Sequence, residues 1–379
     1  MNKRLLKLLS IAGVIVITIA LLMSGCAKPA PSPAPAPSPA PSPAPAPSPA
    51  PTPAPTEEAL NWKYQFYATE GIDPIKWDIH QEFVKELNTM SRGVFDIEMY
   101  AVGELVPLSE MLDNTASNAI QMDVCFTNQW SGRNSAFELF TGYPGGMGAL
   151  ESLMWTIADD GQKYADQLWG QYNIKPFVYP ALTAEIGGQS TFPIKRLEDI
   201  KGRSYRIGAG MAQEILKRLG ANTMWCAGEE VYSSLDRGLI EIATWGPPSE
   251  NWNMKLHEVC PYMYWPGWRK QMDGHAIDVN LDNWNALPDD LKAIFNAGVD
   301  SVRINHTKAF ASEGDYFQMY IDYGTEMHKL PDEDLAKIQA VADEVISEEA
   351  DKNPLFKEIW ENQKAFRAKF GAYNNLGSM

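Results

Sequence analysis

Proline occupies every second position from Pro29 to Pro55, and only alanine, serine and threonine stand between the prolines. Because proline fixes φ and has no amide hydrogen, this stretch can form neither a helix nor the interior of a sheet. We expect an extended spacer, which at about 3.1 Å per residue reaches roughly 80 Å. A ligand for domains of the SH3 type is the alternative, but the strict repeat and low charge favour the spacer.

A basic and apolar segment precedes this repeat. Three basic residues within the first seven positions come before an apolar run over 8–22, and Gly25 stands directly before Cys26. This order is typical of a signal peptide over 1–25, and the end of the segment resembles the lipobox of bacterial lipoproteins. We therefore expect a lipidated Cys26 and a tether over 26–59. An uncleaved anchor helix is the alternative, although the run is shorter than the roughly 20 residues that span a bilayer.

The composition is that of a globular protein that does not bind nucleic acid. Hydrophobic residues make up 45% of the 379 residues, and 48 acidic against 32 basic residues leave a formal net charge of −16. A nucleic-acid binder needs a basic face, and so does a protein that docks electrostatically on an anionic membrane. An anionic ligand would have to be captured by local positive groups against this acidic background.

Strands and helices alternate after residue 60, which is typical of an α/β fold with largely parallel sheets covered by helices. The expected strands lie at 64–67, 94–100, 122–127, 176–179 and 205–207. The expected helices lie at 77–87, 108–119, 161–172, 211–219 and 288–323.

Chemistry-bearing motifs are missing from the sequence. The five histidines stand in no metal-ligand spacing, and there is no CxxC pair, GxSxG turn or GxxxxGK[ST] loop. The protein is therefore predicted not to be an enzyme, and no cofactor is certain. Three cysteines follow Cys26, so at most one disulfide forms among them. Cys226 and Cys260 as a disulfide, or as free thiols, both remain open.

A series of short motifs in fixed order begins near Thr183. The motifs are Gly187-Gly188, Leu197-Glu198-Asp199-Ile200-Lys201-Gly202, Tyr205-Arg206-Ile207, the segments 215–221 and 231–243, and Trp284-Asn285-Ala286-Leu287-Pro288. Their order and spacing resemble the substrate-binding proteins of TRAP transporters, the DctP family, over essentially the whole globular region. Thr244-Trp245-Gly246-Pro247 and the aromatic segment 262–268 are most similar to the branch that binds α-keto and α-hydroxy acids with a metal ion.

This resemblance implies a two-lobed periplasmic-binding-protein-like (type II) fold with a long interdomain helix. Lobe I would contain 60–182 and 272–312, and lobe II would contain 183–271 and 313–379. The implied function is capture of a small carboxylate outside the cytoplasmic membrane and its delivery to the TRAP membrane subunits, with Cys26 as the lipid anchor. A homodimer is one alternative for the oligomeric state.

Arg206 is the first candidate site residue. Strand alternation puts Tyr205 and Ile207 on one face and Arg206 on the other, at a strand end beside a helix start. A guanidinium matches a carboxylate with two parallel hydrogen bonds, and the family uses an arginine at this place to clamp its ligand. A structural salt bridge with one of the many acidic residues is the alternative.

Three further candidates follow from the resemblance. Trp245 matches a tryptophan at the substrate and metal site, with a place in the core as the alternative. Glu185 and Lys270 match a glutamine and an acidic residue that hold the metal in that branch. Glu185 and Trp245 are thus the candidates for binding a Na or Ca ion that bridges the substrate. Our hypothesis is that a Glu185–Lys270 pair replaces this ion.

Residues after two strands of the other lobe should face the ligand, because ligands bind outside the carboxyl ends of parallel strands. Tyr67, Asn128 and Trp130 are the candidates, and packing in the core is the alternative for the two aromatic residues. Two other functions stay open: a sensor protein that presents its ligand to a receptor, and a hydrolase on the same scaffold.

Overall fold

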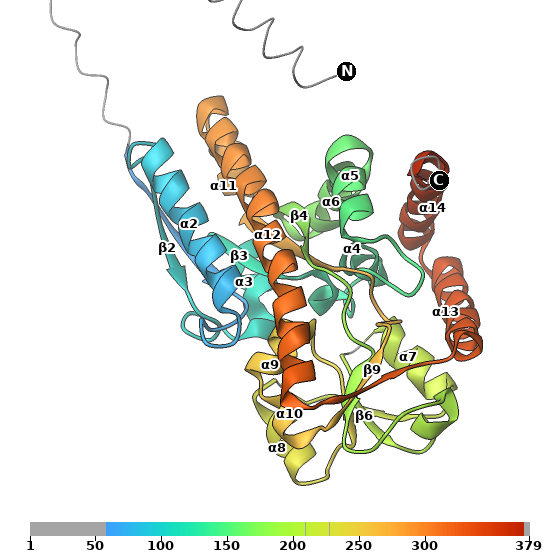
Figure 1. Cartoon of the computed structure of the whole chain (residues 1–379). Helices are drawn as coiled ribbons and strands as arrows, with labels where there is room; N and C mark the ends of the chain where they lie inside the picture. The colour runs from blue at the N-terminus through green and yellow to red at the C-terminus, as the bar shows by residue number, and fades with distance from the viewer. Residues whose placement is uncertain (1–57, 209, 227, 375–379) are drawn as a thin grey trace, which may run out of the picture. The chain divides into compact units, whose positions relative to one another are not determined.

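The computed structural model describes residues 58–208, 210–226 and 228–374 (Figure 1). The predicted signal peptide, Cys26 and the proline repeat lie outside the described residues. The described part contains two β-sheets flanked by helices, which confirms the predicted α/β class. No helix within it is both long enough and apolar enough to cross a membrane.

The first sheet has five strands in the order β2-β1-β3-β10-β4. Its strands are β1 (Leu60–Phe66), β2 (Phe95–Tyr100), β3 (Met122–Phe126), β4 (Ile174–Leu182) and β10 (Asp273–Asn280). Alternation places Phe95 and Ile97 of β2 in the core and Asp96 and Glu98 at the surface. All of β10 is buried, and it lies between β3 and β4.

The second sheet has six short strands in the order β11-β9-β5-β8-β6-β7. Its strands are β5 (Gly188–Ser190), β6 (Ser204–Arg206), β7 (Asn222–Met224), β8 (Ile242–Ala243), β9 (Tyr262–Trp265) and β11 (Glu326–Lys329). β6 lies between β7 and β8 and is parallel to both. The end of this inner strand carries Arg206.

The sheets are largely parallel, as predicted, but each contains one reversed strand. β10 is antiparallel to β3 and β4, and β5 is antiparallel to β8 and β9. The chain leaves the first sheet through β4, enters the second through β5, and returns from β9 to β10. Each entering strand starts at the edge where its neighbours end, so it runs against them.

Helix α2 (Pro74–Met90) shows how the sequence specifies the helices of the first sheet. Asp73 accepts a hydrogen bond from the backbone N–H of Lys76, and proline follows at the first helical position, where its missing N–H costs nothing. Phe83 and Leu87 recur at helical spacing and are buried.

The other shorter helices lie between the strands. They are α3 (Met111–Ala116), α4 (Glu138–Thr141), α5 (Ala149–Ala158), α6 (Gly161–Trp169), α7 (Met211–Arg218), α8 (Gly228–Asp236), α9 (Pro248–Asn253), α10 (Leu256–Val259) and α11 (Leu281–Ala286). The helices expected at 108–119 and 161–172 are shorter: a 3₁₀ turn at Leu108–Glu110 precedes α3, which ends at Ala116, and a 3₁₀ turn at Gly170–Tyr172 follows α6.

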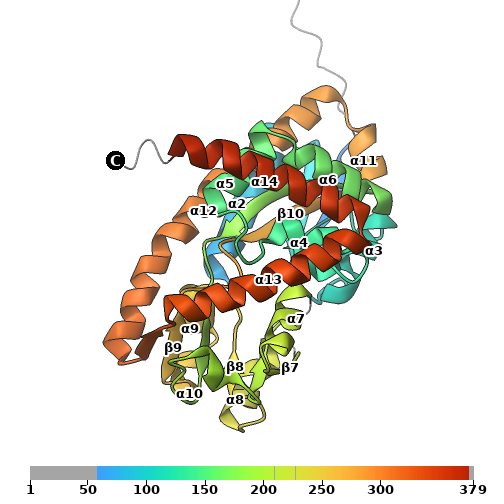
Figure 2. The same ribbon diagram turned by 90° about the vertical axis from the view of Figure 1, so that its right-hand side faces the viewer.

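The predicted long helix is confirmed as α12 (Asp289–Tyr323), which runs beside elements of both sheets (Figure 1). It packs against α2 and β4 and further along against α9. Two helices follow β11, α13 (Asp332–Lys352) and α14 (Pro354–Asn374), and α13 packs against α7 (Figure 2). α14 packs against α5, where Asn362 accepts a hydrogen bond from the Trp155 ring N–H at 2.7 Å.

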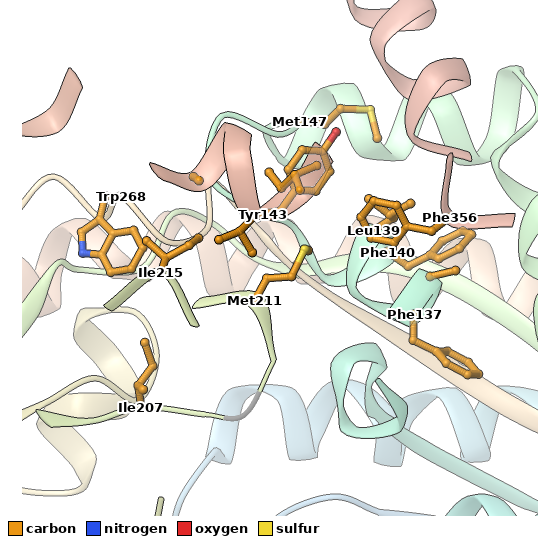
Figure 3. Close-up of a cluster of buried hydrophobic side chains, with 14 of the residues drawn as sticks. Phe137, Leu139, Phe140, Tyr143, Met147, Ile207, Met211, Ile215, Trp268 and Phe356 are labelled. Carbon is orange, nitrogen blue, oxygen red and sulfur yellow. The ribbon is translucent and has the colours of Figure 1, made fainter. Parts of the chain in front are cut away.

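One hydrophobic cluster joins the helices of the first sheet to those of the second. Met211 and Ile215 of α7 belong to the same cluster as Tyr143 and Phe140, and Trp268 lies at one end of the view (Figure 3). Burying side chains of this size contributes about 1.5–3 kcal/mol each. The sequence left open whether Cys226 and Cys260 form a disulfide. In the structure Cys125, Cys226 and Cys260 are all free thiols.

Candidate ligand-binding site

The two crossings between the sheets bring the candidate residues together. Glu185 lies on the crossing from β4 to β5, and Arg269 and Lys270 lie on the crossing from β9 to β10. Arg206 is the last residue of β6. The neighbouring strand β8 ends at Ala243, and Trp245 lies two residues after it. The carboxyl ends of parallel strands and the segments between sheets are where α/β proteins place their ligands.

Arg206 is buried, with 6% of its surface exposed, and its donors point to backbone carbonyls. Nη1 donates to the carbonyl of Thr244 at 2.7 Å, and Nη2 and Nε donate to that of Cys226 at 3.1 and 3.3 Å. The guanidinium carbon lies 4.8 Å from the centre of the Trp245 ring. The ring and two carbonyls therefore hold this guanidinium in one orientation.

No carboxylate in the part of the chain that the structure describes forms an ion pair with Arg206. Burial accordingly lowers the pKa of the Arg206 guanidinium, because the charged form loses water. A guanidinium has five N–H groups, so these three hydrogen bonds leave one N–H on each terminal nitrogen. The salt-bridge alternative for Arg206 therefore has no acidic partner among the residues that the structure describes.

The predicted alternation around Arg206 holds. The Tyr205 hydroxyl donates to the carbonyl of Gly187 at 3.0 Å and contacts the Tyr264 hydroxyl. Tyr205 and Ile207 both belong to the large hydrophobic cluster, whereas Arg206 points to the other side of the sheet.

Beside Arg206 lies a second group of buried charges. Glu185, Arg269 and Lys270 are 3%, 7% and 5% exposed. Arg269 Nη2 forms an ion pair with Glu185 Oε2 and lies 3.4 Å from the carbonyl oxygen of Trp245. Lys270 Nζ lies 4.0 Å from Glu185 Oε1 and 2.9 Å from Asp273 Oδ1. The hypothetical Glu185–Lys270 contact is thus the looser one, and Arg269 is the closer partner of Glu185.

This buried group keeps polar atoms without partners. Glu185 Oε1 and Arg269 Nε have no hydrogen-bond partner among the described residues. Burial lowers the pKa of Arg269 to about 10 and also lowers the pKa of Lys270. Arg269 therefore remains a cation at neutral pH, and donor and acceptor atoms remain for a bound molecule.

The candidates from the first sheet have different surroundings. Asn128 Oδ1 lies 3.3 Å from Thr141 Oγ1, which donates its single proton to Asp273 and accepts a hydrogen bond from Lys270 Nζ at 2.9 Å. Tyr67 is half-buried and donates its hydroxyl proton to Asp73. Trp130 is 3% exposed within the large hydrophobic cluster, as its packing alternative expects.

Sequence reasoning missed two contacts between the sheets. Glu138 on α4 accepts hydrogen bonds from the first backbone N–H of α7, that of Met211. Lys76 on α2 lies 2.5 Å from Glu250 on α9 and 2.5 Å from Asp73. The pairs Glu138–Met211 and Lys76–Glu250 are 73 and 174 positions apart, so periodicity carries no signal for them. Arg269 was also missed as a site residue, and the one sequence feature that could have indicated it is its position next to the candidate Lys270.

Comparisons with known proteins agree with this geometry. The family model described as bacterial extracellular solute-binding protein, family 7 (DctP), matches residues 69–353. A monocarboxylate 2-oxoacid-binding periplasmic protein from Nostoc sp. (strain PCC 7120) is 26% identical over 323 residues, which cover 82% of this chain and 88% of that protein.

Solved structures of TRAP periplasmic solute-binding proteins have the same fold. The protein from Colwellia psychrerythraea, with bound calcium and pyruvate, has a TM-score of 0.79 and 27% identity, covering 85% of this chain and 98% of that one. The protein from Pseudoalteromonas atlantica, with bound sodium and pyruvate, has a TM-score of 0.78 and 24% identity, covering 85% and 98%.

Proposed function

Since the chain belongs to the DctP family of TRAP transporter solute-binding proteins, we propose that it captures a small 2-oxo or 2-hydroxy monocarboxylate and delivers it to TRAP membrane subunits. Members of this family are binding proteins and not enzymes. The 2-oxoacid-binding relative and the pyruvate complex of the Colwellia protein support this class of ligand.

The guanidinium of Arg206, which has no anionic partner among the described residues, carries the proposal. A buried cation without an anionic partner is costly, because it has lost its water and gained no opposite charge. A ligand carboxylate removes this cost, and the two remaining N–H groups suit its two oxygen atoms. The stack on Trp245 keeps the guanidinium in place before the ligand arrives, which lowers the entropy lost on binding.

The proposed ligand lies between the two sheets and stabilises a closed form. Residues 60–182 with 272–312, and 183–271 with 313–379, are the proposed lobes. A ligand shifts a protein between open and closed forms only by its difference in affinity for the two. Arg206 belongs to one lobe, while Asn128 and Tyr67 belong to the other, so closure brings both sets to the ligand.

Anchoring at the membrane is the second part of the proposal. A lipid on Cys26 would retain the protein outside the cytoplasmic membrane, and the proline spacer would separate the folded region from the bilayer. The order of basic, apolar and small residues before Cys26 supports this arrangement. Mass spectrometry of the protein from its native membrane should find diacylglycerol on Cys26 and no residues before it.

Calorimetric titration with pyruvate and other small 2-oxo and 2-hydroxy acids tests the binding function. We expect at least one acid to bind, and Arg206→Ala to weaken it roughly 30-fold or more, because a buried charge pair is lost. Arg203→Ala is the matched control, since Arg203 lies directly before β6 but is half exposed and pairs with Glu241. Equal affinity in wild type and Arg206→Ala would reject the clamp.

A further inference from the structure

The positive charge beside Glu185 suggests how this chain differs from its metal-containing relatives. We infer that Arg269, held by Glu185 and by the carbonyl of Trp245, supplies inside the ligand site the charge that calcium supplies in the Colwellia protein. The carboxylic acid is then bound without a metal ion. This inference rests on the proposed function and adds the source of the second cation to it.

Arg269 contacts the kinds of oxygen atoms that would otherwise bind a metal cation. Its Nη2 lies between a carboxylate oxygen of Glu185 and the backbone oxygen of Trp245. The neighbouring carbonyl, that of Thr244, receives Nη1 of Arg206. Two successive carbonyls therefore bind one guanidinium each, which places both positive groups at the same turn after β8.

The residues present do not suit a metal ion. Calcium needs six to eight oxygen ligands, usually with several carboxylates. The described residues contain no group of three or more His, Cys, Asp or Glu that could hold a metal. Glu185 already faces Arg269 and Lys270, so a divalent ion at this carboxylate would meet two positive groups. Asp273 is paired with Lys270 and is bonded by Thr141.

The balance of charges favours one monoanionic ligand. Among the described ion pairs, Glu185 offsets Arg269 and Asp273 offsets Lys270, which leaves the charge of Arg206 for the ligand. A 2-oxo or 2-hydroxy acid has an oxygen next to its carboxylate that a second cation can bind. Arg269 Nε, which has no hydrogen-bond partner in the described part of the chain, is a donor for that oxygen, and Glu185 Oε1 is an acceptor for a 2-hydroxyl.

Two measurements on the full folded chain test this inference. The first is titration of the tightest-binding acid in chelator and potassium buffer, and again with calcium or sodium added. We expect affinities within about twofold of one another, and a tenfold or greater loss on metal removal would overturn the inference while leaving the proposed function intact. The second is titration of wild type with calcium chloride alone, where saturable binding would also overturn it.

Variants separate a role of Arg269 in binding from a role in folding. Arg269→Met should weaken acid binding tenfold or more, whereas Arg269→Lys, which keeps the charge, should recover most of the affinity. The double variant R269Q/K270E replaces both cations by oxygen-bearing side chains, so calcium should raise its melting temperature but not that of wild type. Arg218→Gln, at an exposed ion pair with Glu348, is the control.

The outcomes distinguish the inference from the function beneath it. Acid binding that is metal-independent but unchanged in Arg269→Met would reject Arg269 and keep Arg206 as the clamp. A protein that binds no small carboxylate in either buffer would overturn the proposed function, and with it any role of Arg269 toward a ligand.

Discussion

Glu138 accepts hydrogen bonds from the backbone N–H of Met211 through both carboxylate oxygens, each at 3.1 Å. Glu138 lies on α4 beside the first sheet, and Met211 is the first residue of α7 in the second. The partial positive charge of a helix start favours this contact. Gly210 leaves room for it, because a Cβ at that position would collide with the Glu138 carboxylate. The contact joins the parts of the chain that carry the two sheets.

Glu138→Gln should change how stability depends on pH. Burial raises the pKa of Glu138 to about 7, above its ordinary value of 4.5. A carboxyl group with a raised folded-state pKa contributes stability below its unfolded pKa, and this contribution is lost as pH rises through about 7. The stability of Glu138→Gln relative to wild type should therefore rise between pH 5 and pH 8, by up to about 3 kcal/mol.

Urea unfolding at these two pH values measures this difference. Glu82→Gln is the control, because Glu82 lies at the surface and pairs with Lys85. If the difference between Glu138→Gln and wild type is the same at both pH values, Glu138 does not titrate as this burial requires.

Trp245→Leu should weaken ligand binding while the protein stays folded. The ring lies under the Arg206 guanidinium at 4.8 Å and is only partly buried, so its loss removes a cation–π contact worth about 1 kcal/mol. We expect an affinity about five- to tenfold lower by calorimetry, and Trp245→Phe should keep most of it. Equal affinity for Trp245→Leu and wild type would mean that the ring serves the core alone.

Gly267→Ala should disrupt the place where the two crossings touch. A Cβ at Gly267 would lie 1.6 Å from the backbone oxygen of Glu185, which no side-chain movement relieves. We expect a loss of about 3 kcal/mol or more in unfolding free energy, or a displaced Glu185 with weakened ligand binding. Gly132→Ala is the control, since nothing lies within 4 Å of a Cβ there. Wild-type stability and binding for Gly267→Ala would contradict the contact.

Local sequence patterns predicted the strands β1 to β4 and β6 and five of the helices, but not β5 or β7 to β11. The alternation in β2 and the helical spacing of α2 were readable because burial repeats every two or 3.6 residues. The long helix α12 was readable from Pro288 and the acidic residues after it. The family followed from motifs in order, and Arg206 followed from its place at a strand end.

The site was only partly readable. The pattern suggested Glu185 with Lys270, but the structure gives Glu185 the nearer partner Arg269, which lies 84 positions away in sequence. Trp130 could be a ligand contact or a core residue, and the structure buries it within the large hydrophobic cluster. An isolated aromatic residue or acid has no period, so its surroundings are not encoded locally.

The sequence by itself determined the α/β class, the long helix α12 and the guanidinium at position 206, because each depends on residues close together in the chain. Tertiary structure alone decided that β5 and β10 run against their neighbours, that Arg206 has no acidic partner among the described residues, and that Glu138 meets α7. These features depend on where distant segments meet, and packing of the two sheets and their crossings sets that.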